Sequence, residues 1–477
     1  MGKYFITTPI FYPNARPHLG NVYPTLVADV LARYHRLMGD ETYFLTGTDE
    51  NTQKMVDAAV KLNKKPIDFL DETVAHFKKT FDNLEISYDQ FIRTTDQQLH
   101  WPGAIKMWNA FVASGDIYKK EYEGLYCVGH EAFVTEKELV DGKCPDHGTV
   151  PEHLAEENYF FKLSKYGPQI KQAILVEDLI IKPTERKNEI LSLIDSGLED
   201  VSFSRPLRDD WPAGLGVPVP NDPSQVMYVW CDALVNYVSA VGYGRDDELF
   251  SQWWPADVHI LGKDILRFHA ALWPAMLMSA GMPLPKTLLV HGLILSGGKK
   301  MSKSLGNVID PIALADEYGV DAVRYYLTRH ISPFNDGDMT PESFKDAYNG
   351  SLANGLGNLV ARIMKLAEDN LEAPIARPEP SAFPVELTDA IDAFEFNKAM
   401  DYIWTRIQLL DARITGEEPF KLVKTDLKAG KALIAELAVE LYWIARYLNP
   451  FMPATSERIK QTILANCKPE SLFKRIE

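Results

Sequence analysis

The first fifty residues alternate between strand-like and helix-like patterns at a spacing that few folds accommodate. Residues 3–8 (KYFITT) form a short run, rich in β-branched and aromatic side chains, that ends at Pro9 and predicts a buried strand. Apolar side chains then recur at helical spacing over residues 22–37, and ETYFLTGTDE predicts a second strand. Pro24 suits only the first turn of a helix, so we expect this helix to begin near residues 20–23. A strand, a helix and a strand in this order predict a parallel α/β sheet with a right-handed crossover.

The rest of the chain departs from this alternation in two places. Its 477 residues suggest roughly three domains. From residue 117 to 225, short strand-like pieces, two Cys-x-x-His pairs and a turn-rich stretch indicate a module inserted into the sheet domain, and after Asn349 the patterns are helical. We expect a sheet domain in two halves (1–116 and 226–293), an insertion (117–225), a linking segment (294–349) and an all-α domain (350–477).

Charge and cysteine content limit the possible classes of protein. The formal net charge of −16 argues against a large polyanion as partner, although it says nothing of local patches. Four cysteines in so long a chain do not make a disulfide framework. No apolar run approaches the roughly 20 residues that span a bilayer, and the start of the chain does not resemble a signal peptide. We therefore expect a cytoplasmic protein without membrane contact.

The stretch His18-Leu19-Gly20-Asn21 follows the first strand and opens the predicted helix. Backbone N–H groups at a helix N-terminus attract phosphate, and His and Asn side chains can donate hydrogen bonds to oxyanions. A glycine there lets a planar base approach the backbone. The alternative is an ordinary loop with an N-cap.

Residues 297–307 (GGKKMSKSLGN) concentrate positive charge between glycines in an otherwise acidic chain. The chain has no GxxxxGK[ST] phosphate loop, so a nucleotide enzyme of this sequence must gather positive charge elsewhere. Lys299, Lys300 and Lys303 could close over a triphosphate. A solvated basic loop is the alternative.

Together the two stretches resemble the signature pair of the class I aminoacyl-tRNA synthetases, HIGH (here HLGN) and KMSKS (here unaltered). ITTPIFYPNARPHLGN, GTDENTQK, YVWCDALVNY and GKDILRFHAALWPAML are similar, in order, to the methionyl branch, and the resemblance covers nearly the whole chain. It implies a Rossmann-like catalytic domain with a connective-peptide insertion, followed by a helical-bundle anticodon-binding domain. It also implies activation of methionine by ATP with Mg²⁺, then transfer to tRNA(Met).

The resemblance also implies roles for particular residues. The methionine side chain would be lined by Ile10, Tyr12, Trp230, Ala233, Tyr237 and His269, with Asp49 holding the ammonium group. Catalysis would rest on His18, Asn21, Lys300 and Lys303, and ATP would also contact Gly20, Gly262, Asp264, Lys299, Met301, Ser302 and Ser304. A soft thioether packs well on aromatic edges, and its sulfur can accept a weak hydrogen bond. Core packing is the alternative for Trp230 and Tyr237, which lie seven apart on a predicted helix.

Two positions depart from the family pattern. Asn21 replaces the last histidine of HIGH, and Asn51-Thr52 replaces the His-Gly of the family's DEHG stretch. Neither change removes the chemistry, because the remaining groups act by positioning and electrostatics.

The insertion contains Cys127-x2-His130 and Cys144-x2-His147. Two such knuckles suit a tetrahedral structural zinc, and the family often carries zinc here; the alternative is two small buried cysteines and surface histidines. The insertion is also shorter than the editing domains of the isoleucyl, valyl and leucyl relatives, which favours methionine.

In the helical region, Asn358 and Arg362 lie four residues apart on one helix face and match the family's anticodon-reading positions. Phe420 stands where the family usually has a stacking Trp. We expect a monomer. Two other functions stay open: a class I synthetase for another amino acid such as cysteine or leucine, and a non-catalytic tRNA-binding paralogue.

Overall fold

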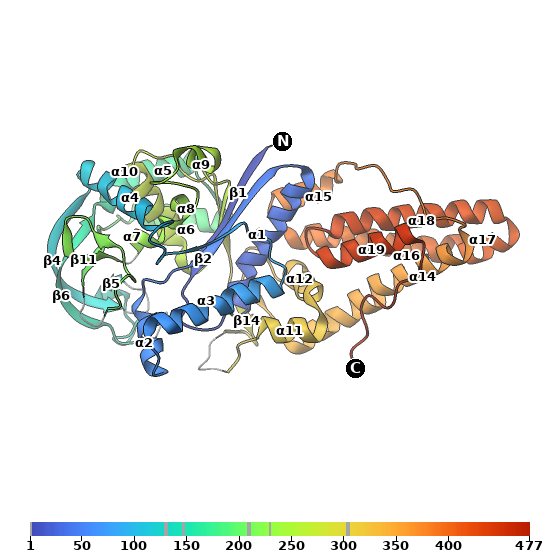
Figure 1. Cartoon of the computed structure of the whole chain (residues 1–477), viewed down its shortest axis with the longest axis horizontal. Coiled ribbons are helices and arrows are strands. Elements are labelled where there is room, and N and C mark those ends of the chain that lie inside the picture. The colour runs from blue at the N-terminus through green and yellow to red at the C-terminus, as the bar shows by residue number, and fades with distance from the viewer. Residues whose placement is uncertain (1, 128–131, 146–147, 208–210, 229, 302–305) are drawn as a thin grey trace. The chain divides into compact units, whose positions relative to one another are not determined.

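The computed structural model describes residues 2–127, 132–145, 148–207, 211–228, 230–301 and 306–477 (Figure 1). The chain forms two compact units, each assembled from separate segments. Unit 1 comprises Met1–Pro17, Glu41–Phe81 and Ser87–Val290, and unit 2 comprises His18–Asp40, Asp82–Ile86 and His291–Glu477. The domain boundaries predicted above stay a prediction.

A six-stranded sheet in the order β3-β2-β1-β12-β13-β7 runs through unit 1. Its strands are β1 (Lys3–Phe11), β2 (Glu41–Thr48), β3 (Gln90–Arg93), β7 (Ile180–Lys182), β12 (Val258–Gly262) and β13 (Thr287–His291). The pairs β1–β2, β1–β12, β2–β3 and β13–β7 are all parallel, which confirms the parallel α/β sheet. Ile6 pairs with Phe44 on one side and Val258 on the other, and all three are buried, as expected for a covered parallel sheet.

The helices of unit 1 bury a large aromatic core beside this sheet. They are α2 (Gln53–Lys61), α3 (Pro66–Asn83, whose last two residues belong to unit 2), α4 (Trp101–Ala113), α5 (Gly167–Leu175), α6 (Thr184–Asp195), α7 (Trp230–Ala233), α8 (Asn236–Ser239), α9 (Asp247–Trp253) and α10 (Trp273–Ser279). Trp108 and Trp273 are buried, and the rings of Phe161 and Phe203 stack at 4.8 Å. Burial of these large rings is a main source of stability for the unit.

Antiparallel strands dominate residues 117–227. One sheet has the order β5-β4-β6-β8, with β4 (Ile117–Cys127), β5 (Ala132–Val134), β6 (Glu152–Phe161) and β8 (Val201–Ser202). A smaller one joins β9 (Ser204–Pro206), β10 (Pro218–Val219) and β11 (Asp222–Met227). Strand β7, which also falls inside the predicted insertion, is instead the edge strand of the parallel sheet.

Unit 2 is mainly helical, which confirms the helical C-terminal region (Figure 1). It contains α1 (Leu19–Met38), α11 (Pro311–Tyr318), α12 (Val320–Arg329), α13 (Pro341–Ala347), α14 (Asn358–Asn370), α15 (Val385–Asp392), α16 (Phe396–Glu417), α17 (Pro419–Thr425), α18 (Leu427–Leu448) and α19 (Pro453–Ala465). Three short strands, β14 (Ile294–Ser296), β15 (Lys299–Lys300) and β16 (Gly337–Asp338), form a small sheet. Helix α18 contacts α14, α16, α17 and α19.

Helix α1 begins at Leu19, slightly earlier than predicted, and Pro24 therefore lies inside the helix rather than in its first turn. Proline cannot donate to the carbonyl four residues earlier, which is that of Gly20. The prediction was wrong because it took Pro24 to mark the helix start. The His18 cap described below instead determines where the helix begins.

A buried arginine holds the separate segments of unit 2 together. Arg324 on α12 is completely buried and forms an ion pair with Asp29 of α1 at 2.6 Å. Its other donors reach the carbonyls of Leu84, Pro450 and Phe451. Every segment of unit 2 thus supplies an acceptor to this one guanidinium. Within the described part of the chain, no helix combines the length and apolarity that crossing a membrane requires.

Candidate active site

His18 and Asn21 form a reciprocal cap at the start of α1. The Gly20 N–H donates to Nδ1 of His18 at 3.0 Å, and the His18 N–H donates to Oδ1 of Asn21 at 3.1 Å. Since Nδ1 accepts, the proton of the neutral ring lies on Nε2. A Cβ at Gly20 would come within 2.7 Å of the His18 ring, so the cap itself requires glycine at this position. The cap therefore orients one imidazole donor and one amide donor at a helix N-terminus.

The lysine stretch begins as a β-hairpin rather than as an irregular loop. Ser296 pairs with Lys299 and Leu295 with Lys300, and the turn consists of Gly297 and Gly298 with φ of 62° and 72°. Two consecutive positive φ values are typical of tight hairpin turns, which explains the glycine pair. The side chains of Lys299 and Lys300 are exposed, and Met301 is buried. Ser302, Lys303 and Ser304 lie outside the described residues.

Both signature stretches belong to unit 2. The Tyr23 ring of α1 packs edge-on against His291 at 5.3 Å, and the Tyr23 hydroxyl donates to the Ser332 carbonyl at 3.1 Å. These contacts connect the helix that follows His18 to the segment that carries the lysine hairpin. Stretches that lie some 280 residues apart in the sequence are therefore held within one compact unit.

In unit 1, the residues predicted to hold methionine and ribose gather at the carboxyl ends of neighbouring strands. Tyr12 follows β1, Asp49 follows β2, and Gly262 ends β12, which pairs with β1. Asp49 is buried, and its N–H donates to the Phe11 carbonyl at 2.9 Å. Asp264 lies exposed just beyond Gly262, and Ile10 is half-buried. Ligands of open parallel sheets bind at this edge.

Trp230, Tyr237 and His269 come together in unit 1. The Tyr237 hydroxyl and Nε2 of His269 lie 2.7 Å apart, and the Trp230 ring stands edge-on to His269 at 5.8 Å. Trp230 also stacks on Phe268 at 4.3 Å. The predicted single helix is in fact two short ones, α7 and α8, because Asn236 donates its side-chain amide to the Ala233 carbonyl at 2.7 Å.

The proton positions in this group follow from one carbonyl. Nδ1 of His269 lies 3.0 Å from the carbonyl oxygen of Ile265, which can only accept, so Nδ1 carries the proton. Nε2 must then accept the hydrogen bond that the Tyr237 hydroxyl donates. Burial lowers the pKa of His269 to about 4, so the ring is neutral at pH 7. His269 lies in a π-helical turn, Phe268–Leu272, a feature often found at functional sites.

Two of the four predicted metal ligands are described. Cys127 and Cys144 are buried in one small cluster with Val134. The N–H of Gly148 donates to the Cys144 carbonyl at 2.7 Å. His130 and His147 lie outside the described residues.

The predicted anticodon-reading residues lie on two helices of unit 2. Asn358 is exposed at the start of α14, and Arg362 follows on the same helix in an ion pair with Asp411. Phe420 on α17 is 43 % exposed, which is unusual for so large an apolar ring. An exposed aromatic ring and an oriented guanidinium are both suited to stacking on unpaired bases.

Comparison with known proteins identifies the family. A family model described as tRNA synthetases class I (M) matches residues 4–150 and 147–364. The methionine–tRNA ligase of Clostridium acetobutylicum is 43% identical over 474 residues, which cover 96% of this chain and 73% of that protein. The chain belongs to the methionine–tRNA ligase family. The ligase of Thermotoga maritima is 41% identical over 491 residues, covering 98% of this chain and 76% of that protein.

Solved structures of the methionine–tRNA ligase family agree. Mycobacterium tuberculosis methionyl-tRNA synthetase in complex with methionyl-adenylate is 36% identical, with a TM-score of 0.89 over 100% of this chain and 98% of that chain. The parallel sheet with its helices is thus the Rossmann-like fold of class I synthetases, as predicted.

The sequence did not predict the side chains that hold the loop around Asp49 in place. The adjacent Glu50 is buried and accepts from Thr48 at 2.6 Å and from Nε of Arg93 at 2.8 Å. Asn51 donates its amide to Oδ2 of Asp232 at 3.0 Å and to the Met227 carbonyl at 2.9 Å. The signal was present, because charged and amide residues sit beside Asp49 and between Trp230 and Ala233.

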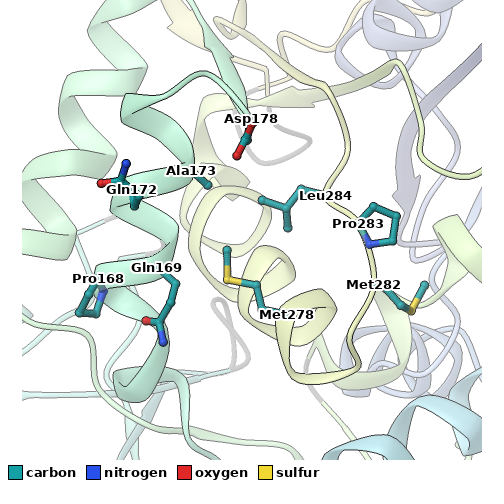
Figure 2. Close-up of a pocket in the computed structure, with 9 residues that line it drawn as sticks. All are labelled: Pro168, Gln169, Gln172, Ala173, Asp178, Met278, Met282, Pro283 and Leu284. Carbon is teal, nitrogen blue, oxygen red and sulfur yellow. The ribbon is translucent and has the colours of Figure 1, made fainter.

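One pocket lies away from the residues that are predicted to bind methionine and ATP. It has a volume of about 710 Å³ and lies in unit 1 between α5 and the end of α10, with Met278, Met282 and Leu284 on one side (Figure 2). None of the predicted site residues lines it. The lining is largely apolar, and its one charged side chain among the described residues is the carboxylate of Asp178, which would repel a phosphate.

Proposed function

We propose that this chain is a methionine–tRNA ligase. It activates methionine with ATP to methionyl-adenylate and pyrophosphate, and then transfers methionine to the 3′-terminal adenosine of tRNA(Met). The observation that carries this proposal is the match to methionine–tRNA ligases over 96% of the chain at 43% identity. The alternative of a synthetase for another amino acid finds no support in these comparisons.

Methionine recognition is assigned to unit 1. Trp230, Tyr237 and His269 offer aromatic edges to the thioether, and Ile10, Tyr12 and Ala233 complete the proposed lining. The buried carboxylate of Asp49 pairs with the substrate ammonium group. Because the His269 ring is neutral, no imidazolium charge penalises an uncharged side chain.

Activation requires the methionine carboxylate to attack the α-phosphate of ATP, and negative charge develops there. His18 and Asn21 donate hydrogen bonds to the phosphate oxygens, and Lys300 and Lys303 stabilise the developing charge. Gly20, Lys299, Met301, Ser302 and Ser304 contribute further ATP contacts, and Gly262 and Asp264 hold the ribose. Mg²⁺, which aminoacyl-tRNA synthetases generally use with ATP, would help to neutralise the phosphates when it is bound with the nucleotide.

The same family assignment gives the remaining partners. Asn358, Arg362 and Phe420 read the anticodon of tRNA(Met). Cys127 and Cys144, buried in one cluster, would hold a structural zinc together with His130 and His147. Zinc would fix the short knuckles that have little core of their own. We also propose that the protein is a cytoplasmic monomer.

The test is amino-acid-dependent ATP–pyrophosphate exchange without tRNA, run separately with methionine, leucine, isoleucine, valine and cysteine. Exchange with methionine alone supports the proposal, and Lys303→Ala should reduce it by at least tenfold. Lys431→Ala, which removes a lysine paired with Glu372 on the helical bundle, is the matched control and should leave it unchanged. Exchange with a different amino acid would refute the methionine assignment, and folded protein without any exchange would point to the non-catalytic paralogue.

A further inference from the structure

Three cations lie close together on the helical part of unit 2, and a fourth shares a tyrosine neighbour with one of them. This basic cluster consists of Arg377 in the linker after α14, Arg406 on α16, Arg446 on α18 and Lys460 on α19. Burial lowers the pKa of Lys460; Glu457 opposes that effect, and the charges of Arg446 and Arg377 add to it. The charges of Arg377 and Arg446 thus both act on Lys460, and those of Arg406 and Arg446 both act on Tyr447.

The basic cluster lacks the acidic partners that other cations of the same helices have. Arg413, for comparison, is surrounded by Glu417, Glu436 and Glu440. Among the described residues, none of the four cluster members forms an ion pair. The nearby Glu457 carboxylate accepts a hydrogen bond from Gln461 at 3.0 Å. The chain has a net charge of −16, and yet these cations have no ion-pair partner in the part of the chain that the structure describes. Their mutual repulsion destabilises this part of the fold, and a bound anion would reduce it.

Aromatic side chains hold the arginines of the basic cluster in place. The Arg446 guanidinium lies over the Phe383 ring at 5.6 Å, and Phe383 packs edge-on against Tyr447 at 5.3 Å. Arg377 donates to the Tyr442 hydroxyl at 3.2 Å. The Nε atom of Arg446 is buried and has no hydrogen-bond partner among the described residues. Oriented guanidinium groups are suited to the bidentate binding of phosphate groups.

We propose that the basic cluster binds the phosphodiester backbone of an RNA stem, and that this RNA is the tRNA of the proposed function, on which the inference rests. Cations spread over four chain segments, two of them exposed (Arg377 and Arg406), suit an extended polyanion rather than a single small phosphate. Backbone contacts position the RNA and carry no base sequence, so the basic cluster is separate in role from Asn358, Arg362 and Phe420.

The experiment measures tRNA binding to the full chain as a function of salt concentration. Arg377→Gln and Arg406→Gln change exposed side chains and should each weaken binding several-fold at low salt. Each should also reduce the slope of log affinity against log salt by about one. The loss should be equal for tRNA(Met) and for a non-cognate tRNA. ATP–pyrophosphate exchange without tRNA should stay unchanged.

Arg413→Gln is the matched control, because it removes the same charge from a site rich in carboxylates and should leave the salt slope unaltered. If both cluster variants bound tRNA as tightly as the wild-type chain, the inference would be wrong, whereas the proposed function would be unaffected. If the two variants kept their affinity for tRNA but no longer bound inorganic phosphate or pyrophosphate, the basic cluster would be a small-anion site. The RNA assignment would then be wrong. A wild-type chain that binds no tRNA would overturn the inference and also the proposed tRNA charging, even if exchange with methionine persisted.

Discussion

At the scale of single residues, the direction of each hydrogen bond fixes where the protons lie on the buried histidines of the proposed methionine site. The Ile265 carbonyl requires a proton on Nδ1 of His269, which makes Nε2 the acceptor for the Tyr237 hydroxyl. His259 is held in the same way, since the Trp273 N–H donates to its Nε2 at 3.3 Å and its Nδ1 then donates to the Thr7 hydroxyl at 2.7 Å. Both rings are thus fixed as neutral tautomers by neighbours that cannot exchange roles.

Replacing Asn51 tests whether this residue positions the side chains that are proposed to bind methionine. Asn51→Ala removes the amide that joins the loop after Asp49 to Asp232 on α7. We expect the KM for methionine to rise roughly tenfold, equivalent to about 1.4 kcal/mol, with little change in the KM for ATP. Gln53→Ala, which removes the side-chain bond from Gln53 to Asp57 on α2, is the control. An equal rise in both KM values would mean that the fold, rather than methionine binding, had suffered.

The buried histidines predict how stability depends on pH. In the folded chain burial lowers the pKa of His269, and likewise that of His100, to about 4, whereas the unfolded value is near 6.5. The unfolded chain therefore binds protons more readily, and the stabilisation present above pH 6.5 is lost as pH falls toward 4. Each histidine should contribute a loss of about 2 kcal/mol between pH 7 and 5. Urea unfolding should show this, with a shallower pH dependence for His269→Gln; an unchanged slope would contradict it.

At the scale of elements, the sequence predicted the parallel strands and long helices well, because apolar periodicity reports them directly. Short elements escaped prediction. The break between α7 and α8 depends on one side-chain hydrogen bond from Asn236, and β15 is too short to show any periodicity. Glu50 and Asp232 were missed for another reason: their partners lie far away along the chain. Local patterns carry no information on such contacts.

The hairpin turn before Lys299 offers a test at the element scale. Gly298 has φ of 72° and open space around its missing Cβ, so Gly298→Ala would cost only backbone strain, about 1 kcal/mol. The hairpin should then be less populated, and exchange activity should fall several-fold with the KM for methionine unchanged. Gly416→Ala, on α16 with an ordinary φ, is the control. Equal activity of both variants would mean that the turn does not matter for the lysines.

At the scale of the whole molecule, each compact unit is built from segments far apart in the sequence, which composition and motifs could not reveal. Arg324→Leu removes the cation that pairs with Asp29 and leaves that carboxylate buried. We expect unit 2 to lose about 3 to 5 kcal/mol of unfolding free energy, measurable by urea denaturation followed through Trp404 and Trp443 fluorescence. Arg33→Leu, which removes the more exposed partner of Asp29, should cost far less. Similar losses for both would contradict the central role of Arg324.

The acceptors of Arg324 also bear on how the protein is made. Asp29 leaves the ribosome long before the Pro450 and Phe451 carbonyls are added, because these lie about 420 residues further along the chain. At ordinary synthesis rates roughly 20 to 80 s separate them. Throughout that interval α1 carries a carboxylate that cannot yet be buried, so unit 2 cannot close its core until residues 450 and 451 have left the ribosome. The helix that presents His18 is therefore synthesised well before it can acquire its native surroundings.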